Sequence, residues 1–229
     1  MSLLSDFYYL FYPRLCPICK EVLRAQETFF CSACIVALPR TYYELEDNNP
    51  IEKHFWGRIP IENAMAYLFF TKKGQIQNLM HQLKYKKKKE IGEVLGKALG
   101  EALAIAPKYQ DIDLVIPVPI HPQKIKKRGY NQSAIIAQAL ALALEKDIIL
   151  NVLIKKIQTE TQTRKNRFSR WKNVQDVFGL QNSEKLKYKH ILLVDDVITT
   201  GATLESCARL LESIEGVRIS IACLAAPQY

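Results

Sequence analysis

The feature that most constrains the fold is the run ILLVDDVITTGATLES at 191–206. Apolar residues are followed by two adjacent carboxylates, Asp195 and Asp196, and then by a short turn and a helical segment that begins near Thr203. A buried strand that leads into a helix is typical of a parallel sheet covered by helices, and such sheets bind ligands at the carboxyl ends of their strands. The run therefore predicts an α/β fold with a binding site at this strand end.

The residues after the two carboxylates suit a phosphate group. Backbone amides at the start of a helix attract anions, and the hydroxyls of Thr199, Thr200 and Thr203 add hydrogen-bond donors. Gly201 lets the backbone approach the phosphate because it has no Cβ. Carboxylates repel phosphate but accept hydrogen bonds from sugar hydroxyls, so the combination indicates a ribose 5-phosphate. The chain has neither the G-x-G-x-x-G pattern of dinucleotide sites nor the G-x-x-x-x-G-K-[ST] pattern of triphosphate sites.

Strand-like and helical segments alternate through residues 61–229, which predicts a parallel sheet flanked by helices. Ser133 is a candidate cap for one helix, and glycines at every fourth residue from Gly92 to Gly100 indicate close packing of another helix against a neighbour. Strands are expected at 64–70, 113–119, 149–155, 191–194 and 217–224, and helices within 75–106, 133–146 and 203–214.

Four cysteines near the N-terminus form the pattern C-x2-C-x11-C-x2-C, namely Cys16, Cys19, Cys31 and Cys34. Two such pairs supply the four thiolates of a closed, tetrahedral, structural zinc site. Disulfides are the alternative, but a chain without an export signal is expected in a reducing compartment, where this spacing favours metal. The isolated Cys207 and Cys223 are expected in the core.

Residues 1–40 are too few to form a hydrophobic core of their own, so we expect them to be a zinc-binding domain held together by its metal. Residues 41–60 contain chain breakers and are expected to be a connector, which leaves 61–229 as the main domain. The chain has no apolar stretch long enough to span a membrane and no secretory signal, which predicts a soluble, cytoplasmic protein.

The net charge of +9 is unevenly distributed, because residues 1–60 hold six basic and seven acidic residues. Clusters of basic residues are often solvated surface, and the functional alternative is a polyanion, either a phosphorylated small molecule or nucleic acid. The basic residues cluster at 84–89, 124–128 and 155–172.

The run at 191–206 closely resembles the motif with which type I phosphoribosyltransferases bind 5-phosphoribosyl 1-diphosphate (PRPP). By that resemblance, Asp195 and Asp196 bind the ribose hydroxyls. The 5-phosphate is then held by the loop residues Thr199, Thr200, Gly201, Ala202 and Thr203. The resemblance also implies that Mg²⁺ accompanies PRPP.

Further motifs resemble the competence protein F (ComF) family, whose order of motifs matches residues from about 8 to 228. The segment IPVPIHPQKIKKRGYNQS at 116–133 fits the family pattern P-V-P-x-H-P…R-G-[FY]-N-Q. It places Lys127, Arg128 and Gly129 in a second strand-end loop, where Arg128 is expected to contact diphosphate. Lys84 is a further candidate for phosphate contact, and His121 is expected to cap a turn.

A long basic segment at 159–178 fits a second family pattern, T-x-x-Q…R-x-x-N-V, although Lys165 stands where an apolar residue is expected. Aromatic and basic side chains of this kind bind single-stranded DNA, and a loop that closes over PRPP needs the same residues, so both interpretations remain open. The candidate residues of this flexible loop are Gln162, Arg164, Arg167, Arg170 and Asn173.

The ComF resemblance implies a PRPP-binding protein of DNA uptake in natural transformation. Single-stranded DNA and DNA-uptake or recombination proteins are then its partners. The alternative is an active phosphoribosyltransferase with an amine-like acceptor and no DNA role. Thr199 stands where enzymes of this type that use purine bases have a carboxylate, and its hydroxyl cannot serve as a base near neutral pH. An amine, which attacks through its own lone pair, needs less help. The sequence identifies no catalytic residue.

Overall fold

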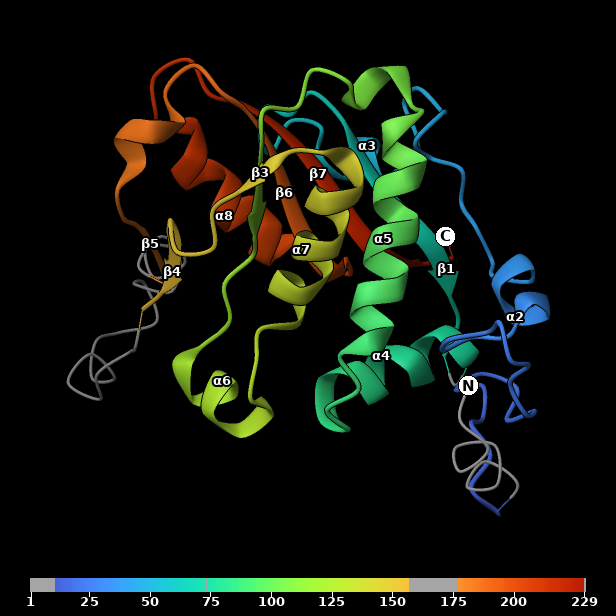
Figure 1. Ribbon diagram of the computed structural model, residues 1–229. Helices are drawn as coiled ribbons and strands as arrows, with labels where there is room; N and C mark the ends of the chain where they lie inside the picture. Colours follow the sequence, from blue (N-terminus) through green and yellow to red (C-terminus); the bar gives the residue numbers. More distant parts are fainter. Residues whose placement is uncertain (1–10, 73, 157–176, 229) are drawn as a thin grey trace.

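The computed structural model describes residues 11–72, 74–156 and 177–228. Its centre is a five-stranded sheet in the order β1-β7-β6-β2-β3, and all neighbouring strands run parallel (Figure 1). This confirms the predicted fold class. The strands are β1 (Ala64–Phe70), β2 (Leu114–Pro117), β3 (Asp147–Ile148), β6 (His190–Val197) and β7 (Arg218–Pro227).

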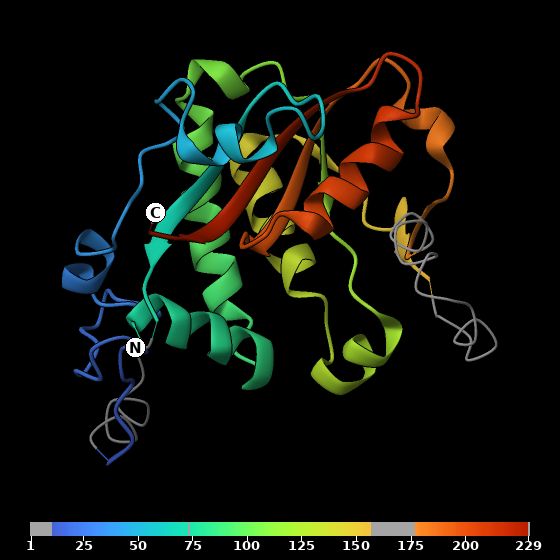
Figure 2. The same ribbon diagram turned by 180° about the vertical axis from the view of Figure 1, so that it is seen from behind.

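Helices cover both faces of the sheet. Helices α5 (Glu90–Ala104) and α7 (Gln132–Leu144) cover one face, and α3 (Pro50–Phe55) and α8 (Ala202–Glu212) cover the other, which is turned to the viewer in Figure 2. Helices α4 (Gln75–Tyr85) and α6 (Pro122–Arg128) lie at the carboxyl ends of the strands. The short helices are α2 (Ser32–Val36), η1 (Pro107–Tyr109) and η4 (Ser183–Leu186). None of the helices in the described ranges has the length and apolar character needed to cross a membrane.

The core lies between the sheet and its helices. The central strands β6 and β7 are buried along almost their whole length because both of their faces are covered. Cys207 on α8 and Cys223 on β7 are fully buried, as expected for packing residues.

The strand expected at 149–155 is wrong as a single element. The chain forms β3 before it and β4 (Leu153–Lys155) at its end, and β4 pairs with β5 (Phe178–Leu180) in a separate antiparallel sheet. Leu150 and Asn151 lie on the surface between the two strands, whereas Val152 is buried. The apolar content of 149–155 therefore did not indicate the turn that this segment contains.

The glycines of α5 allow the close packing that their spacing predicts. A Cβ at Gly96 would lie 2.5 Å from the carbonyl oxygen of Ile136, and one at Gly100 would lie 2.6 Å from that of Leu140. Both carbonyls belong to α7, so the backbones of α5 and α7 approach more closely than larger residues would permit.

The segment 41–60, expected as a connector, contains helix α3 and packs into the main domain. Ile51 and Phe55 are fully buried. The side chain of Asn49 caps α3 by accepting a hydrogen bond from the amide of Ile51 (2.9 Å), and it donates to the carbonyl oxygen of Ala64 on β1 (2.9 Å). The chain is thereby attached to the first strand before it enters the sheet.

Candidate functional site

The two carboxylates at the end of β6 are buried and hydrogen-bonded. Asp195 Oδ1 accepts from the hydroxyl of Ser133 (2.8 Å) and from the amide of Asp196 (2.8 Å). Asp196 Oδ1 accepts from the amide of Val197 (3.0 Å), and Asp196 Oδ2 lies 2.5 Å from Lys84 Nζ. Both carboxylates belong to the strand itself, which extends to Val197, rather than to the turn after it.

Ser133 does not cap its helix. Asn131 is the N-cap of α7 and accepts from the amide of Ser133 (3.0 Å), so the expected cap lies two residues too late. The serine side chain is fully buried and is directed to Asp195 instead. A short hydroxyl residue near a helix start fits either role, and the neighbouring strand decides between them.

Asp195 has unusual electrostatics. Burial and repulsion from Asp196 raise the pKa of Asp195 to about 7, against the opposing effects of the Ser133 hydroxyl, the Asp196 amide and the charge of Lys84. A ligand that brings a cation or hydroxyl donors favours the ionised form. The site is therefore suited to a ligand that compensates negative charge.

The loop after β6 encloses a small cavity of about 50 Å³. Gly201 has φ +69° and is the N-cap of α8, so the amides of the first turn of that helix face the loop. The threonine side chains 199, 200 and 203 are exposed. The cavity brings together all five loop residues that the sequence predicted, and its lining is Asp195, Val197, Ile198, Thr199, Thr200, Gly201, Ala202, Thr203 and Leu204.

Helix α3 supports this loop from the other side. His54 Nε2 lies 2.9 Å from the carbonyl oxygen of Thr200, to which the Nε2–H tautomer donates, and the Arg58 guanidinium lies within 3.4 Å of the same oxygen. Arg58 also pairs with Glu205 in the first turn of α8 (2.5 Å). A Cβ at Gly201 would lie only 2.8 Å from His54 Nε2, so the close approach requires glycine. Sequence reasoning missed His54 and Arg58, because nothing in the sequence links residues so far from the loop to it.

The second predicted loop is mostly helix. Pro122 begins α6, His121 caps it by accepting from the amide of Gln123 (3.2 Å), and Gly129 ends it with φ +89°. The expectation that His121 caps a turn is confirmed. The expectation that Lys127 and Arg128 lie in a loop is wrong, since both belong to the last turn of α6.

Arg128 is held by its neighbours in this structure. Its guanidinium donates to Gln132 Oε1 (2.8 Å) and lies 5.1 Å from the centroid of the Tyr85 ring. Lys84, expected at the diphosphate, is instead paired with Asp196. The structure thus brings Lys84 to the acidic pair, and it directs Arg128 toward Gln132 and Tyr85.

Most of the basic segment lies outside the described residues. Its candidates Gln162, Arg164, Arg167, Arg170 and Asn173 lie outside the described residues. Lys155, at the start of this segment, ends β4 with its Nζ 4.8 Å from the centroid of the Phe178 ring. Burial and the nearby charge of Lys124 lower the pKa of Lys155.

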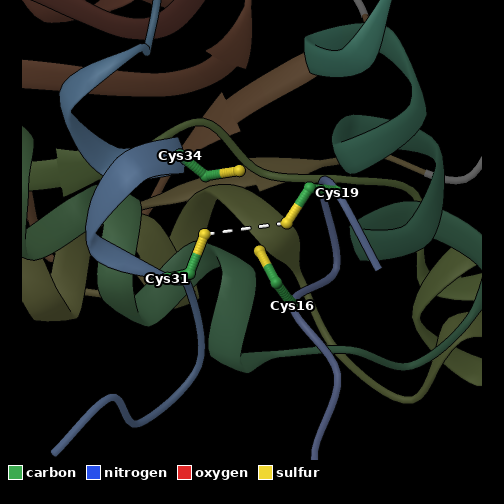
Figure 3. A group of neighbouring side chains, drawn as sticks. All are labelled: Cys16, Cys19, Cys31 and Cys34. Carbon is green, nitrogen blue, oxygen red and sulfur yellow. Dashed lines mark hydrogen bonds between the residues drawn. The ribbon is translucent and has the colours of Figure 1, made fainter. Parts of the chain in front are cut away.

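The four N-terminal cysteines converge on one point (Figure 3). Their sulfur atoms all lie within 4.8 Å of one another, and Cys19 Sγ and Cys31 Sγ are 3.6 Å apart. A tetrahedral zinc ion with Zn–S bonds of about 2.3 Å separates its sulfurs by roughly 3.8 Å. All four thiols are free. The cluster is therefore compatible with zinc, and four protein ligands leave no coordination position for a substrate.

A buried carboxylate stabilises the second cysteine pair. Glu27 accepts hydrogen bonds from the amide (2.7 Å) and hydroxyl (2.9 Å) of Ser32 and from the amide of Arg24 (2.8 Å). These donors lower the pKa of Glu27, with the Ser32 amide making the largest contribution. The turn that presents Cys31 is thus stabilised even without an ion.

Residues 125–228 match the family model of the phosphoribosyl transferase domain. The DNA utilization protein YhgH of Shigella flexneri is 27% identical, over 92% of this chain and 89% of its own length. Competence protein F of Haemophilus influenzae is 31% identical over 59% of this chain and 61% of its own length. Competence protein ComFC of Bacillus subtilis is 29% identical over 47% of this chain and 42% of its own length. The resemblance to the ComF family is confirmed by these homologues and by the matched domain.

Proposed function

We propose that this chain, a homologue of the competence F and YhgH proteins, binds PRPP with Mg²⁺ at the carboxyl end of β6 and acts in DNA uptake. The observation that carries the proposal is one small cavity lined by the buried carboxylate of Asp195 and by exposed threonines, with the second buried carboxylate, Asp196, next to it in the chain. Carboxylates accept from ribose hydroxyls, while threonine hydroxyls and helix amides donate to a phosphate. The two halves suit the two ends of a ribose 5-phosphate.

Asp195 has one carboxylate oxygen that can accept a hydrogen bond from a ligand hydroxyl. Ser133 and the amide of Asp196 both bond to its Oδ1, which leaves Oδ2 for a ribose hydroxyl. Ionisation of this buried group is unfavourable until a ligand compensates its charge. Ligand binding and loss of the Asp195 proton are therefore linked.

Asp196 and Lys84 suggest how Mg²⁺ fits the site. Lys84 supplies one positive charge to Asp196, and carboxylate and phosphate oxygens are the ligands that Mg²⁺ prefers. Mg²⁺ bound with the diphosphate would neutralise negative charge as the diphosphate departs. Mg²⁺ would then compensate the charge of Asp196 in place of Lys84. The Lys84 ammonium would be free to contact the diphosphate.

A role in DNA binding is supported by the names of the homologues and by the basic charge. The lysines at 86–89 follow α4, at the same end of the sheet as the phosphate cavity (Figure 1). Single-stranded DNA binds proteins through basic side chains that follow the phosphates and aromatic side chains that stack on bases. DNA-uptake or recombination proteins are the partners that this role requires. A four-cysteine cluster that binds zinc fits a reducing, cytoplasmic environment.

The alternative function is phosphoribosyl transfer to an amine, without a DNA role. Thr199 favours it over transfer to a purine, because the residue at this position cannot remove a proton from a ring nitrogen near neutral pH. We expect no useful turnover with adenine, guanine or hypoxanthine. Rapid diphosphate release with any of these bases would contradict the inference from Thr199.

Calorimetric titration with PRPP, with and without Mg²⁺, tests the ligand directly. We expect binding that requires Mg²⁺. Absence of PRPP binding in the zinc-loaded, full-length protein would overturn the proposal. Diphosphate release, measured with candidate acceptors, then separates an enzyme from a protein that only binds.

A salt titration tests DNA binding. The affinity for a single-stranded oligonucleotide should fall steeply with salt, because each phosphate that the protein neutralises releases counterions. Substitution of Arg167→Ala with Arg170→Ala should flatten the slope by roughly one unit for each phosphate that is no longer neutralised. An affinity that is independent of salt, or no binding at low salt, would count against the DNA role.

A further inference from the structure

A second cavity adjoins the phosphate cavity. It has a volume of about 190 Å³, and Val197 at the end of β6 lines both cavities. Lys84 also lines the second cavity, while its Nζ is paired with Asp196. The second cavity therefore adjoins the proposed ribose site, across Val197 from the phosphate loop. Its lining is Phe70, Gln77, Met80, His81, Lys84, Tyr85 and Val197.

The lining suits a flat ring. Phe70, His81 and Tyr85 are aromatic, and the rings of His81 and Tyr85 lie 4.9 Å apart, centre to centre, at 43°. Lys84 adds a cation at the edge nearest the ribose site. Pockets for drug-sized ligands have volumes of roughly 300–1,000 Å³, so a cavity of about 190 Å³ suits one small ring.

The position of the cavity matches the needs of a transferase. Such an enzyme must hold a nucleophile beside the ribose and away from the 5-phosphate, within a few ångströms of the anomeric carbon. We propose that this cavity binds the acceptor and that the acceptor is a single-ring aromatic amine. The inference depends on the proposed PRPP site, and it assigns the second substrate to a separate cavity.

His81 is the side chain on the cavity wall that can accept a proton from the amine. In the proposed step the amine lone pair forms a bond to the anomeric carbon, and the bond from that carbon to the diphosphate oxygen breaks. The diphosphate leaves with the bonding electron pair. The imidazole of His81 then accepts the proton that the amine nitrogen must lose. His81 lies on the cavity wall, where it would touch the acceptor.

The test uses 2-aminobenzoate, a fluorescent single-ring amine, added to the full-length protein saturated with PRPP and Mg²⁺. We expect a saturable change in its fluorescence as the ring enters the apolar cavity. Gln77→Trp places a large side chain at the cavity rim and should weaken binding at least tenfold. Gln75→Trp makes the same change at an exposed position of the same helix outside the cavity, and it should bind as the wild type does.

Two further measurements separate the proposed step from binding alone. His81→Ala should still bind PRPP, and it should lose diphosphate release with 2-aminobenzoate by roughly 100-fold, the scale of general base catalysis. Benzoate, which lacks the amine, should compete for the cavity and release no diphosphate.

The outcomes distinguish this inference from the proposed function. If PRPP does not bind to the wild type, the proposed function fails. If PRPP binds but 2-aminobenzoate does not, or if Gln77→Trp and Gln75→Trp bind it equally, the acceptor cavity is wrong. If single-stranded DNA displaces the ring and diphosphate release is absent, the cavity receives a base of DNA and the acceptor inference is overturned.

Discussion

The cysteine cluster and the β6 site show two different ways of holding charged groups in place. Around the cysteines, the described part of residues 11–40 buries few large apolar side chains, among them Leu23, Phe30 and Leu38. At the β6 site, the carboxylates end a strand whose apolar residues are fully buried under helices. We expect the first region to depend on an ion for its stability, whereas the second receives its geometry from the core. Loss of the cysteine thiolates should therefore unfold the first region, whereas loss of the carboxylates should weaken ligand binding and leave the fold intact.

The largest effect should follow from Cys16→Ser or Cys31→Ser. We expect zinc to fall from one ion per chain to none and the segment 11–40 to unfold, because a structural zinc ion contributes roughly 10–16 kcal/mol to the folding of such modules. Metal analysis and protease sensitivity measure the two effects. Cys207→Ser is the contrasting variant, since it places a hydroxyl in the core and should lower the melting temperature while zinc stays bound. Two disulfides and no zinc in the purified protein would contradict the prediction.

The double change Asp195→Asn with Asp196→Asn should reduce ligand binding without unfolding the protein. The fold should persist, because the strand is held by its apolar residues, while Mg²⁺-dependent PRPP binding should weaken by about 100-fold or more. Each hydrogen bond to a charged group contributes roughly 1.5–3 kcal/mol, and two carboxylates are removed. Calorimetry measures the affinity, and Asp147→Asn on the exposed end of β3 is the control. Unchanged affinity would place PRPP elsewhere.

The same comparison explains what the sequence reveals and what it does not. The strand β1, the helical region within 75–106 and the turn at 199–201 that leads into α8 follow from local patterns, and the structure has them at the expected places. The four cysteines are equally local, since their spacing alone brings the thiols together. Contacts between distant residues do not follow from such patterns. The bond between Ser133 and Asp195 spans 62 positions, and that between His54 and Thr200 spans 146.

The contacts that α3 makes with the loop after β6 can be tested separately. Helix α3 lies in the segment that leads from the cysteine cluster to the sheet. His54→Ala with Arg58→Ala should weaken PRPP binding by roughly tenfold, because Thr200 loses the donors that fix its carbonyl and each hydrogen bond contributes about 1 kcal/mol. Lys53→Ala, on the exposed side of α3, should have no effect. His54→Gln keeps a donor and should recover part of the affinity. If His54→Gln is as weak as the double variant, the loop is not positioned by this bond.

The smallest expected effect is a pH-dependent change in stability at Asp195. Burial and the neighbouring Asp196 raise the pKa of Asp195 to about 7, whereas an unfolded aspartate has a pKa near 3.9. Between these values the folded state holds a proton that the unfolded state has lost, so the contribution of this group to stability is present at low pH and is lost as pH rises from about 4 to about 7.

Asp195→Asn removes this dependence and can still accept the hydrogen bond from Ser133. In the absence of PRPP we therefore expect the variant to gain stability relative to the wild type between pH 5 and pH 8. For a domain of this size, about 1 kcal/mol moves the melting temperature by roughly 2–4 °C, so the difference should be a few degrees. Because the cysteine cluster is the same in both proteins, pH effects on the thiols cancel in the comparison. A variant that loses stability relative to the wild type over this range would show that Lys84 compensates the ionised pair, and the site would then be stable in its charged form before any ligand arrives.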